Sequence, residues 1–255
     1  MTIQFPIKAV VLDIEGTTTP VTFVYDVLFP FARKAFPSFL EKHWNEAPVV
    51  SDIKLVQEQH TADVADGLNP PLLKIDGTQQ KQAASYTAYL LWQMDQDRKT
   101  TGLKSLQGKI WEQGYKDGAL LGDLFEDVAG ILKQLHRSGI PIYIYSSGSI
   151  HAQKLLFGQT KEGDLLSLLS GHFDTTTGPK REAQSYKLIV ESIGKEPGNI
   201  LFATDVVQEA DAAVEAGMQA VILDRPGNHP QPKHKHTVWQ TLKPILDLLN
   251  TPLIQ

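Results

Sequence analysis

The stretch KAVVLDIEGTTTP, residues 8–20, decides the fold, because an apolar run ends within it at an acidic turn. The run Lys8–Ile14 is short, rich in aliphatic residues and without polar–apolar alternation, which is typical of a strand buried on both faces of a parallel sheet. Asp13, Glu15 and Thr17 lie at its carboxyl end, the edge of an open α/β sheet where ligands bind. The stretch therefore predicts a strand that carries polar groups into a binding site.

Three similar apolar runs occur later in the chain, at Ile140–Ser146, Asn199–Asp205 and Gln219–Asp224. Helical stretches precede or separate them, and each ends directly before a glycine, a common residue after a helix. These predicted helices are Phe125–Ser138, Ala183–Ile193 and Val207–Ala216. The alternation of strand and helix predicts an α/β fold with a doubly wound, mostly parallel sheet.

The segment between Ile14 and Ile140 is far too long for a simple crossover between two strands. Helical periodicity runs through it from Gln79 to about Trp111 without a proline, and residues 66–77, DGLNPPLLKIDG, predict a loop. We therefore expect an all-α helical cap domain, residues 20–122, inserted into an α/β core of residues 1–19 and 123–255. The aromatic residues Tyr86, Tyr89 and Trp92 are interpreted as helix-packing core of this insertion.

Composition excludes several classes of protein. The 255 residues contain no cysteine, which excludes disulfides, thiolate zinc sites and a cysteine nucleophile and fits a reducing compartment such as the cytoplasm. The net charge of −5 argues against nucleic acid as a partner. No apolar stretch is long enough to span a membrane, and no apolar patch or heptad pattern requires a second chain, so we expect a cytoplasmic monomer.

Polar groups follow the predicted strands at one edge of the sheet. Besides Asp13 and Glu15, they are Ser146 with Ser147 and the acid Asp205, and Lys180 lies in the loop before a predicted helix. Two carboxylates two residues apart, with a hydroxyl pair and an ammonium, are what phosphoryl transfer through an aspartyl phosphate requires. Hard oxygen ligands without His or Cys favour Mg²⁺ over zinc.

This pattern resembles the haloacid dehalogenase-like (HAD-like) superfamily, whose first motif is DxDGT followed by a Ser/Thr, a Lys and a terminal acid. Glu15 departs from it, because most phosphatases of the superfamily carry Asp there. Longer motifs resemble the bifunctional enolase-phosphatase (acireductone synthase) family of methionine salvage over about residues 8–228. These motifs are LDIEGTTTP (12–20), WQMDQDRKTT (92–101), YIYSSGS (143–149), QKLLFG (153–158), GHFDT (171–175) and RPGN (225–228).

The resemblance implies a Mg²⁺-dependent enzyme that enolises 2,3-diketo-5-methylthiopentyl-1-phosphate. It then hydrolyses the phosphate ester to give the acireductone 1,2-dihydroxy-3-keto-5-methylthiopentene and phosphate. By position, Asp13 is the nucleophile and a metal ligand, and Glu15 is the general acid/base with a metal contact through its main-chain carbonyl. Ser146, Ser147 and Lys180 bind the substrate phosphate, and Asp205 completes the metal site.

Several alternatives stay open at this stage. Either Glu15 or Lys180 could remove the C1 proton, although a lysine base would need a lowered pKa. Glu209, one helical turn after Asp205, is either a second acid near the metal or a solvated helix residue. Ser146–Ser149 could merely cap the following helix. The insertion also contains polar residues that are candidates for contact with the methylthioalkyl end of the substrate, namely Gln93, Asp95, Arg98 and Lys99.

One further interpretation concerns the histidine-rich segment near the end of the sequence, and two rival functions concern the whole chain. His229, His234 and His236 lie in HPQPKHKH, which favours a surface loop over a metal site. The first rival function is a sugar-phosphate phosphatase or mutase of the same superfamily, without enolase activity. The second is a phosphometabolite-binding protein with a decayed site, which the intact set of motif residues disfavours.

Overall fold

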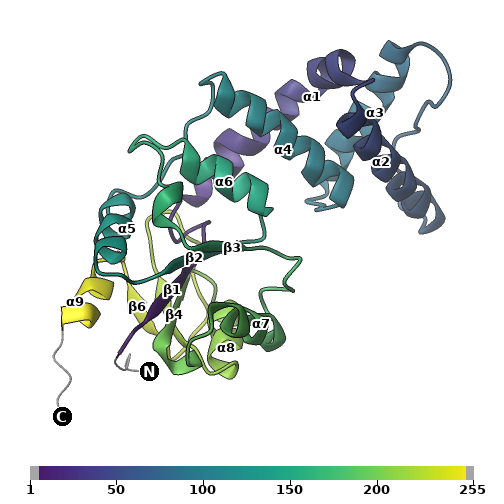
Figure 1. Ribbon diagram of the computed structural model, residues 1–255. Coiled ribbons are helices and arrows are strands. Elements are labelled where there is room, and N and C mark those ends of the chain that lie inside the picture. Colours follow the sequence, from purple (N-terminus) through teal and green to yellow (C-terminus); the bar gives the residue numbers. More distant parts are fainter. Residues whose placement is uncertain (1–5, 251–255) are drawn as a thin grey trace. The chain divides into compact units, whose positions relative to one another are not determined.

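The computed structural model describes residues 6–250, which form two compact units (Figure 1). The α/β unit comprises the described parts of Met1–Tyr25 and Leu121–Gln255, and the helical unit comprises Asp26–Leu120. The boundaries expected from the sequence lie a few residues away from these. The role of the helical unit as a cap stays a prediction.

The α/β unit contains a fully parallel sheet in which six strands are found among the described residues, in the order β3-β2-β1-β4-β5-β6. The strand β1 lies inside the sheet, where Val10 pairs with Ile142 on one side and with Leu201 on the other. The strands are β1 (Ala9–Leu12), β2 (Ile142–Tyr145), β3 (Gly171–Phe173), β4 (Ile200–Thr204), β5 (Gln219–Leu223) and β6 (Thr237–Trp239).

Helices pack on the two faces of this sheet, which makes it doubly wound as expected (Figure 1). Alternate strand residues, such as Val11 and Phe202, join a core with α7 and α8 on one face. The strand residues between them point to the other face, where α5 contacts β2 and α9. The helices of the unit are α5 (Val128–Arg137), α6 (Ile150–Gly158), η2 (Leu166–Leu168), α7 (Ala183–Ile193), η3 (Pro197–Asn199), α8 (Val207–Glu215) and α9 (Pro244–Asn250).

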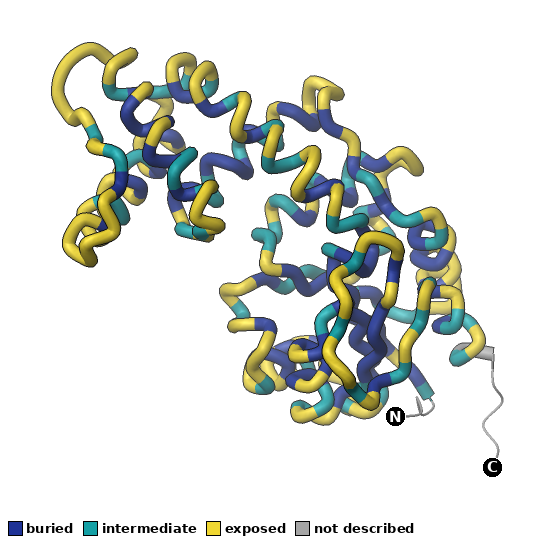
Figure 2. Tube along the Cα trace, turned by 180° about the vertical axis from the view of Figure 1, so that it is seen from behind, coloured by how far each residue is buried: buried dark blue, intermediate teal, exposed yellow. Residues whose placement is uncertain are grey.

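The four predicted strands are confirmed, but β3 and β6 were missed. Both are three residues long, and neither is fully buried. A short edge strand lacks the continuous apolar run that identifies a central parallel strand. Figure 2 shows the contrast, since the inner strands are dark blue, whereas exposed residues gather on loops and outer helix faces.

The helical unit has a core of its own, built by apolar residues such as Phe36, Tyr86 and Leu106. Tyr89 belongs to it and Trp92 packs against it, so their assignment to helix packing is confirmed. Here α1 packs against α3 and α4, and α2 packs against α4. Its helices are α1 (Phe29–His43), α2 (Ala47–Ala65), α3 (Gln79–Asp95) and α4 (Thr101–Lys116), and the π-helix η1 (Phe23–Leu28) precedes them.

The helical periodicity that runs from Gln79 to about Trp111 belongs to two helices, not to one. Asp97 adopts a left-handed conformation with φ of 48°, and Thr100 is extended before α4 begins. Aspartate tolerates the left-handed region better than most residues, so the chain turns here without a glycine or proline to signal it. The loop predicted at residues 66–77 does lie between α2 and α3.

A buried carboxylate organises the helical unit. Asp63 has no exposed surface and accepts hydrogen bonds from Tyr89 Oη at 2.6 Å, Gln59 Nε2 at 2.7 Å and Arg98 Nη2 at 2.7 Å. Burial acts to raise the pKa of Asp63, but these three donors outweigh burial and hold that pKa below its usual value. Two candidates for substrate contact are thus engaged within the unit, since Arg98 binds Asp63 and Asp95 pairs with Arg33 at 2.6 Å.

We expect Asp63→Asn to lower the free energy of unfolding by about 2–3 kcal/mol, because an amide cannot accept from all three donors and leaves the Arg98 charge without its partner. Urea unfolding measures this change. Asp66→Asn, at an exposed position just after α2, is the matched control and should change stability by less than about 0.5 kcal/mol.

The Asp63 contribution also depends on pH. Because the pKa of the folded state is lowered, the stabilisation is present above about pH 4 and is lost as the pH falls through the lower, folded-state pKa. The difference between wild type and Asp63→Asn should therefore shrink in acid. A difference that persists unchanged below pH 3 would contradict a charge-dependent role.

Candidate active site

Asp13 lies at the carboxyl end of β1, where its main-chain N–H still pairs with the Ala203 carbonyl at 2.9 Å. The chain then turns sharply, since the N–H groups of Thr17, Thr18 and Thr19 all point to the Ile14 carbonyl. Gly16 has φ of 69°, a conformation that residues with a Cβ rarely adopt. This turn leaves the Asp13 side chain at the sheet edge, with 5% of the residue exposed.

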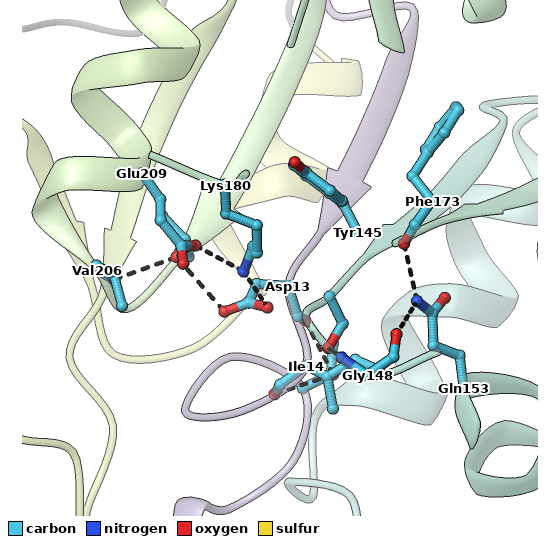
Figure 3. A network of polar contacts seen from close by, with 12 residues as sticks. Asp13, Ile14, Tyr145, Gly148, Gln153, Phe173, Lys180, Val206 and Glu209 are labelled. Atoms are coloured by element: carbon cyan, nitrogen blue, oxygen red, sulfur yellow. Dashed lines mark hydrogen bonds and ion pairs between the residues drawn. The ribbon is translucent and has the colours of Figure 1, made fainter. Parts of the chain in front are cut away.

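Lys180 connects two carboxylates in this buried region (Figure 3). Its Nζ lies 2.6 Å from Asp13 Oδ1 and 2.6 Å from Glu209 Oε2, and its side chain is 6% exposed. The loop that carries it is held by the Tyr186 hydroxyl, which donates to the Lys180 carbonyl at 2.7 Å. Residues from three separate parts of the sequence therefore meet at one ammonium group.

The environment keeps Lys180 protonated. Burial alone lowers the pKa of Lys180, but the negative charges of Asp13 and Glu209 outweigh burial and raise that pKa above its usual value. A lysine that serves as a base at neutral pH requires the opposite shift. The geometry therefore disfavours Lys180 as the group that accepts a proton and favours it as a fixed positive charge.

The acids after β4 complete the buried cluster. Glu209, on α8, accepts from Thr204 Oγ1 at 2.8 Å as well as from Lys180, and burial raises the pKa of its carboxyl. The alternative of a solvated Glu209 is therefore wrong. Asp205 is 8% exposed, and its carboxylate lies so close to Gly16 that a Cβ there would overlap with Asp205 Oδ2.

The residues present fit a hard divalent cation. Three carboxylates are buried here, those of Asp13, Asp205 and Glu209, and only Asp13 and Glu209 contact the Lys180 ammonium. The pKa of Asp205 is raised to about 7, first by burial and then by its two acidic neighbours. A bound cation would offset this excess negative charge. Among residues 6–250, no three His, Asp or Glu side chains form a metal-binding group, but the expected site needs only two carboxylates and the Glu15 carbonyl.

The loop after β2 carries the two serines. Ser146 is buried, its N–H donates to the Phe173 carbonyl at 3.2 Å, and its hydroxyl accepts from the Gly148 N–H at 3.2 Å, whereas Ser147 is exposed. Because β2 is the parallel neighbour of β1, this loop and the Asp13 turn extend from the same edge of the sheet. Helix capping is done by Ser149, whose Oγ accepts from the Ala152 N–H.

Gln153 fixes this serine loop, a role that the sequence did not indicate. Its Nε2 donates to the Gly148 carbonyl at 3.0 Å and to the Phe173 carbonyl at 2.8 Å (Figure 3). Its Oε1 lies 3.0 Å from His172 Nδ1. Gln153 is 1% exposed. Glu15, by contrast, lies half-buried in the turn after Asp13.

The histidine-rich segment is not entirely a surface loop. His229 is exposed, but the side chain of His236 is only 4% exposed, and its Nε2 lies 2.7 Å from Asp211 Oδ1 on α8. The interpretation as a surface loop is therefore wrong for His236. Its position directly before β6, a strand that the sequence did not reveal, explains why it is buried.

Residues 7–217 match the model of the haloacid dehalogenase-like hydrolases, so the chain is a hydrolase of that superfamily. Members are generally Mg²⁺-dependent. A protein of Xenopus tropicalis named enolase-phosphatase E1 is 49% identical over 88% of this chain and 87% of its own length. The chain therefore belongs to the enolase-phosphatase E1 family, as its motifs indicated.

Two further relatives support this placement. An Arabidopsis thaliana protein named probable bifunctional methylthioribulose-1-phosphate dehydratase/enolase-phosphatase E1 is 47% identical over 91% of this chain and 46% of its own length. The crystal structure of the UTR4 protein from Saccharomyces cerevisiae has a TM-score of 0.75 and 31% sequence identity, with 93% of this chain and 99% of that chain covered.

Proposed function

We propose that this member of the family enolises 2,3-diketo-5-methylthiopentyl-1-phosphate and then hydrolyses its phosphate ester to release the acireductone. The Arabidopsis relative supports this substrate, because its name joins the family to a methylthioribulose-1-phosphate dehydratase. Loss of water from that phosphorylated keto sugar gives a 2,3-diketone with the phosphate still on C1. The proposal rests above all on the buried contact of Lys180 with both Asp13 and Glu209.

In the phosphatase step, a carboxylate oxygen of Asp13 attacks phosphorus, and the bond between phosphorus and the substrate's C1 oxygen breaks. Glu15 gives its proton to the departing oxygen and then takes one from the water that attacks the aspartyl phosphate. This second attack releases phosphate and restores the Asp13 carboxylate. The position of Glu15 two residues after Asp13, in the same tight turn, suits a group that alternates between acid and base.

Fixed positive and hydrogen-bonding groups hold the phosphoryl oxygens. Lys180 is already oriented by two carboxylates, so little reorganisation is needed when charge shifts onto the phosphoryl group. Ser146 and Ser147 donate hydrogen bonds to it from the loop that Gln153 fixes. Asp13, Asp205 and the Glu15 carbonyl would hold Mg²⁺, which supplies positive charge next to the phosphoryl group and the substrate oxygens.

In the enolase step, a proton passes from C1 to a base and the C2 oxygen takes one from water, which converts the diketone into an enol that still carries its phosphate. We assign removal of the C1 proton to Glu15, which then holds the proton that it gives to the departing oxygen in the phosphatase step. The paired carboxylates hold Lys180 in its charged form, and a charged ammonium cannot accept a proton. Its charge instead stabilises the oxygen on which negative charge develops.

The wider setting is also part of the proposal. Among the residues that the structure describes, no helix combines the length and hydropathy needed to cross a bilayer. The proposal includes a monomer that acts in the cytoplasm on a small phosphorylated diketone, without nucleic acid or membrane as a partner. The absence of cysteine supports a reducing compartment, and the net charge of −5 disfavours nucleic acid.

Ultraviolet absorbance tests both steps in one sample. With the diketo phosphate or its desthio analogue and Mg²⁺, we expect a transient enol-phosphate band, then the acireductone band with an equal amount of phosphate released. EDTA should remove both bands, because the buried carboxylates would lose the cation that offsets their charge.

Two results would contradict the proposal. Phosphate release from simple sugar phosphates, with no enol band from the diketone, would show that the protein is instead a sugar-phosphate phosphatase of the same superfamily. Full activity in EDTA would show that the reaction does not require Mg²⁺.

A further inference from the structure

The segment Arg225–Asn228, RPGN, is fixed against the Asp13 turn by a buried arginine. Arg225 is 4% exposed and donates from Nη1 to Asp127 Oδ1 at 2.6 Å. Its Nε donates to the Thr17 carbonyl at 2.8 Å, so it joins the end of β5 to the turn after β1. Gly227, with φ of 90°, then reverses the chain and brings Asn228 back toward that turn.

The side-chain amide of Asn228 has only one possible orientation. Its Nδ2 donates to the Gly16 carbonyl at 2.9 Å and to the Leu223 carbonyl at 3.0 Å. Carbonyl oxygens only accept hydrogen bonds, so an exchange of the amide nitrogen and oxygen would place acceptor against acceptor. Both amide hydrogens are therefore used, and Oδ1 points away from these two carbonyls.

The Oδ1 atom is buried and has no hydrogen-bond partner among the described residues. A buried amide oxygen is rarely left without a donor, so its partner is expected to be a group that binds at this place. A Cβ built on Gly16 would lie 2.8 Å from Asn228 Oδ1 and would also overlap with Asp205 Oδ2. The two oxygens thus border the same small space above Gly16.

We propose that Asn228 is a positioning residue of the metal site, whose Oδ1 accepts a hydrogen bond from a water molecule bound to the cation that Asp13 and Asp205 hold. This inference rests on the proposed function. Mg²⁺ usually keeps several of its waters in proteins, and oriented acceptors for those waters raise metal affinity. A neutral amide oxygen next to Asp205 supplies such an acceptor without adding to the excess negative charge.

Binding of Mn²⁺, followed by electron paramagnetic resonance of the free ion, tests this without any turnover. We expect Asn228→Ala to raise the Mn²⁺ dissociation constant by about 10-fold or more, within the range for residues that orient metal-bound groups. Asn228→Asp keeps an oxygen at this place but loses the donors to Gly16 and Leu223. Its dissociation constant for Mn²⁺ should exceed the wild-type value by no more than about threefold.

The paired variants separate the two roles of the amide. If Asn228 acted only by bracing Gly16 through Nδ2, both variants would lose affinity equally, and that result would overturn the inference. Unchanged binding by Asn228→Ala would overturn it as well. Circular dichroism and thermal unfolding in EDTA check that each variant is folded. If Asn228→Ala does not fold, the Mn²⁺ affinity of Asn228→Asp relative to wild type still tests the inference.

Asp205→Asn distinguishes failure of this inference from failure of the proposed metal site. We expect it to weaken Mn²⁺ binding by at least about 100-fold, since it removes a negatively charged ligand. If wild type binds no Mn²⁺, or if Asp205→Asn binds it normally, the metal site itself is wrong. If Asp205→Asn behaves as expected and Asn228→Ala binds as wild type, only the role of Asn228 is wrong.

Discussion

Replacement of Asp13 by Asn should abolish phosphate release, with kcat lowered by about 10⁴-fold or more, or roughly 5.4 kcal/mol of transition-state stabilisation. The amide has nearly the same shape as the carboxylate but is not a nucleophile toward phosphorus. Glu209 still holds Lys180 in place at 2.6 Å, so the phosphoryl-binding groups should stay oriented. Substrate binding should therefore survive, and calorimetry together with a phosphate-release assay measures the two effects separately.

Asp224→Asn is the matched control for this replacement. Asp224 also follows a strand of the same sheet, β5, but it is exposed, whereas Asp13 is buried. We expect this control variant to release phosphate within about twofold of wild type. Normal phosphate release by Asp13→Asn would show that another group attacks phosphorus, and the aspartyl-phosphate mechanism would have to be abandoned.

Loss of the Lys180 ammonium should have the second-largest effect. We expect Lys180→Ala to lower kcat/KM by at least about 10²-fold, equivalent to about 2.7 kcal/mol. The change removes a positive charge from the phosphoryl oxygens and leaves Asp13 and Glu209 buried without their shared partner. Lys180→Met, which keeps most of the side-chain volume, separates the loss of charge from the loss of packing and should be impaired to a similar degree.

Steady-state kinetics and thermal unfolding of the two variants distinguish catalysis from stability. Removal of one member of a buried ion pair costs about 3–5 kcal/mol of folding free energy, so both variants should also unfold at lower temperature. Their kinetics are therefore compared well below that temperature. A near-wild-type kcat/KM for either variant would contradict the role of Lys180 as the fixed charge of the site.

The central strands and the residues at their ends could be predicted from the sequence because one physical cause fixes both. A strand buried on two faces must be apolar throughout, so the first polar residue after it marks the sheet edge where ligands bind. Asp13 and Asp205 were found in this way. The short strands β3 and β6 lack that pattern because each is only partly buried.

Other members of the site could not be assigned from the sequence because their roles depend on tertiary contacts. The sequence left Glu209 open between a second acid near the metal and a solvated helix residue, and only its buried contact with Lys180 excludes the solvated alternative. Gln153 and Asn228 act through main-chain carbonyls of residues distant in sequence, which no local pattern encodes. Their motifs indicated family membership, but the structure was needed to assign them a physical task.

The central position of β1 has a consequence for biosynthesis. During translation this strand leaves the ribosome well before its two neighbours, because β2 and β4 are made only after the whole helical unit has been synthesised. The helical unit has a self-contained core, so it can fold while both edges of β1 are still unpaired. An apolar strand with two free edges is prone to aggregate, which makes the nascent chain most vulnerable before β2 emerges.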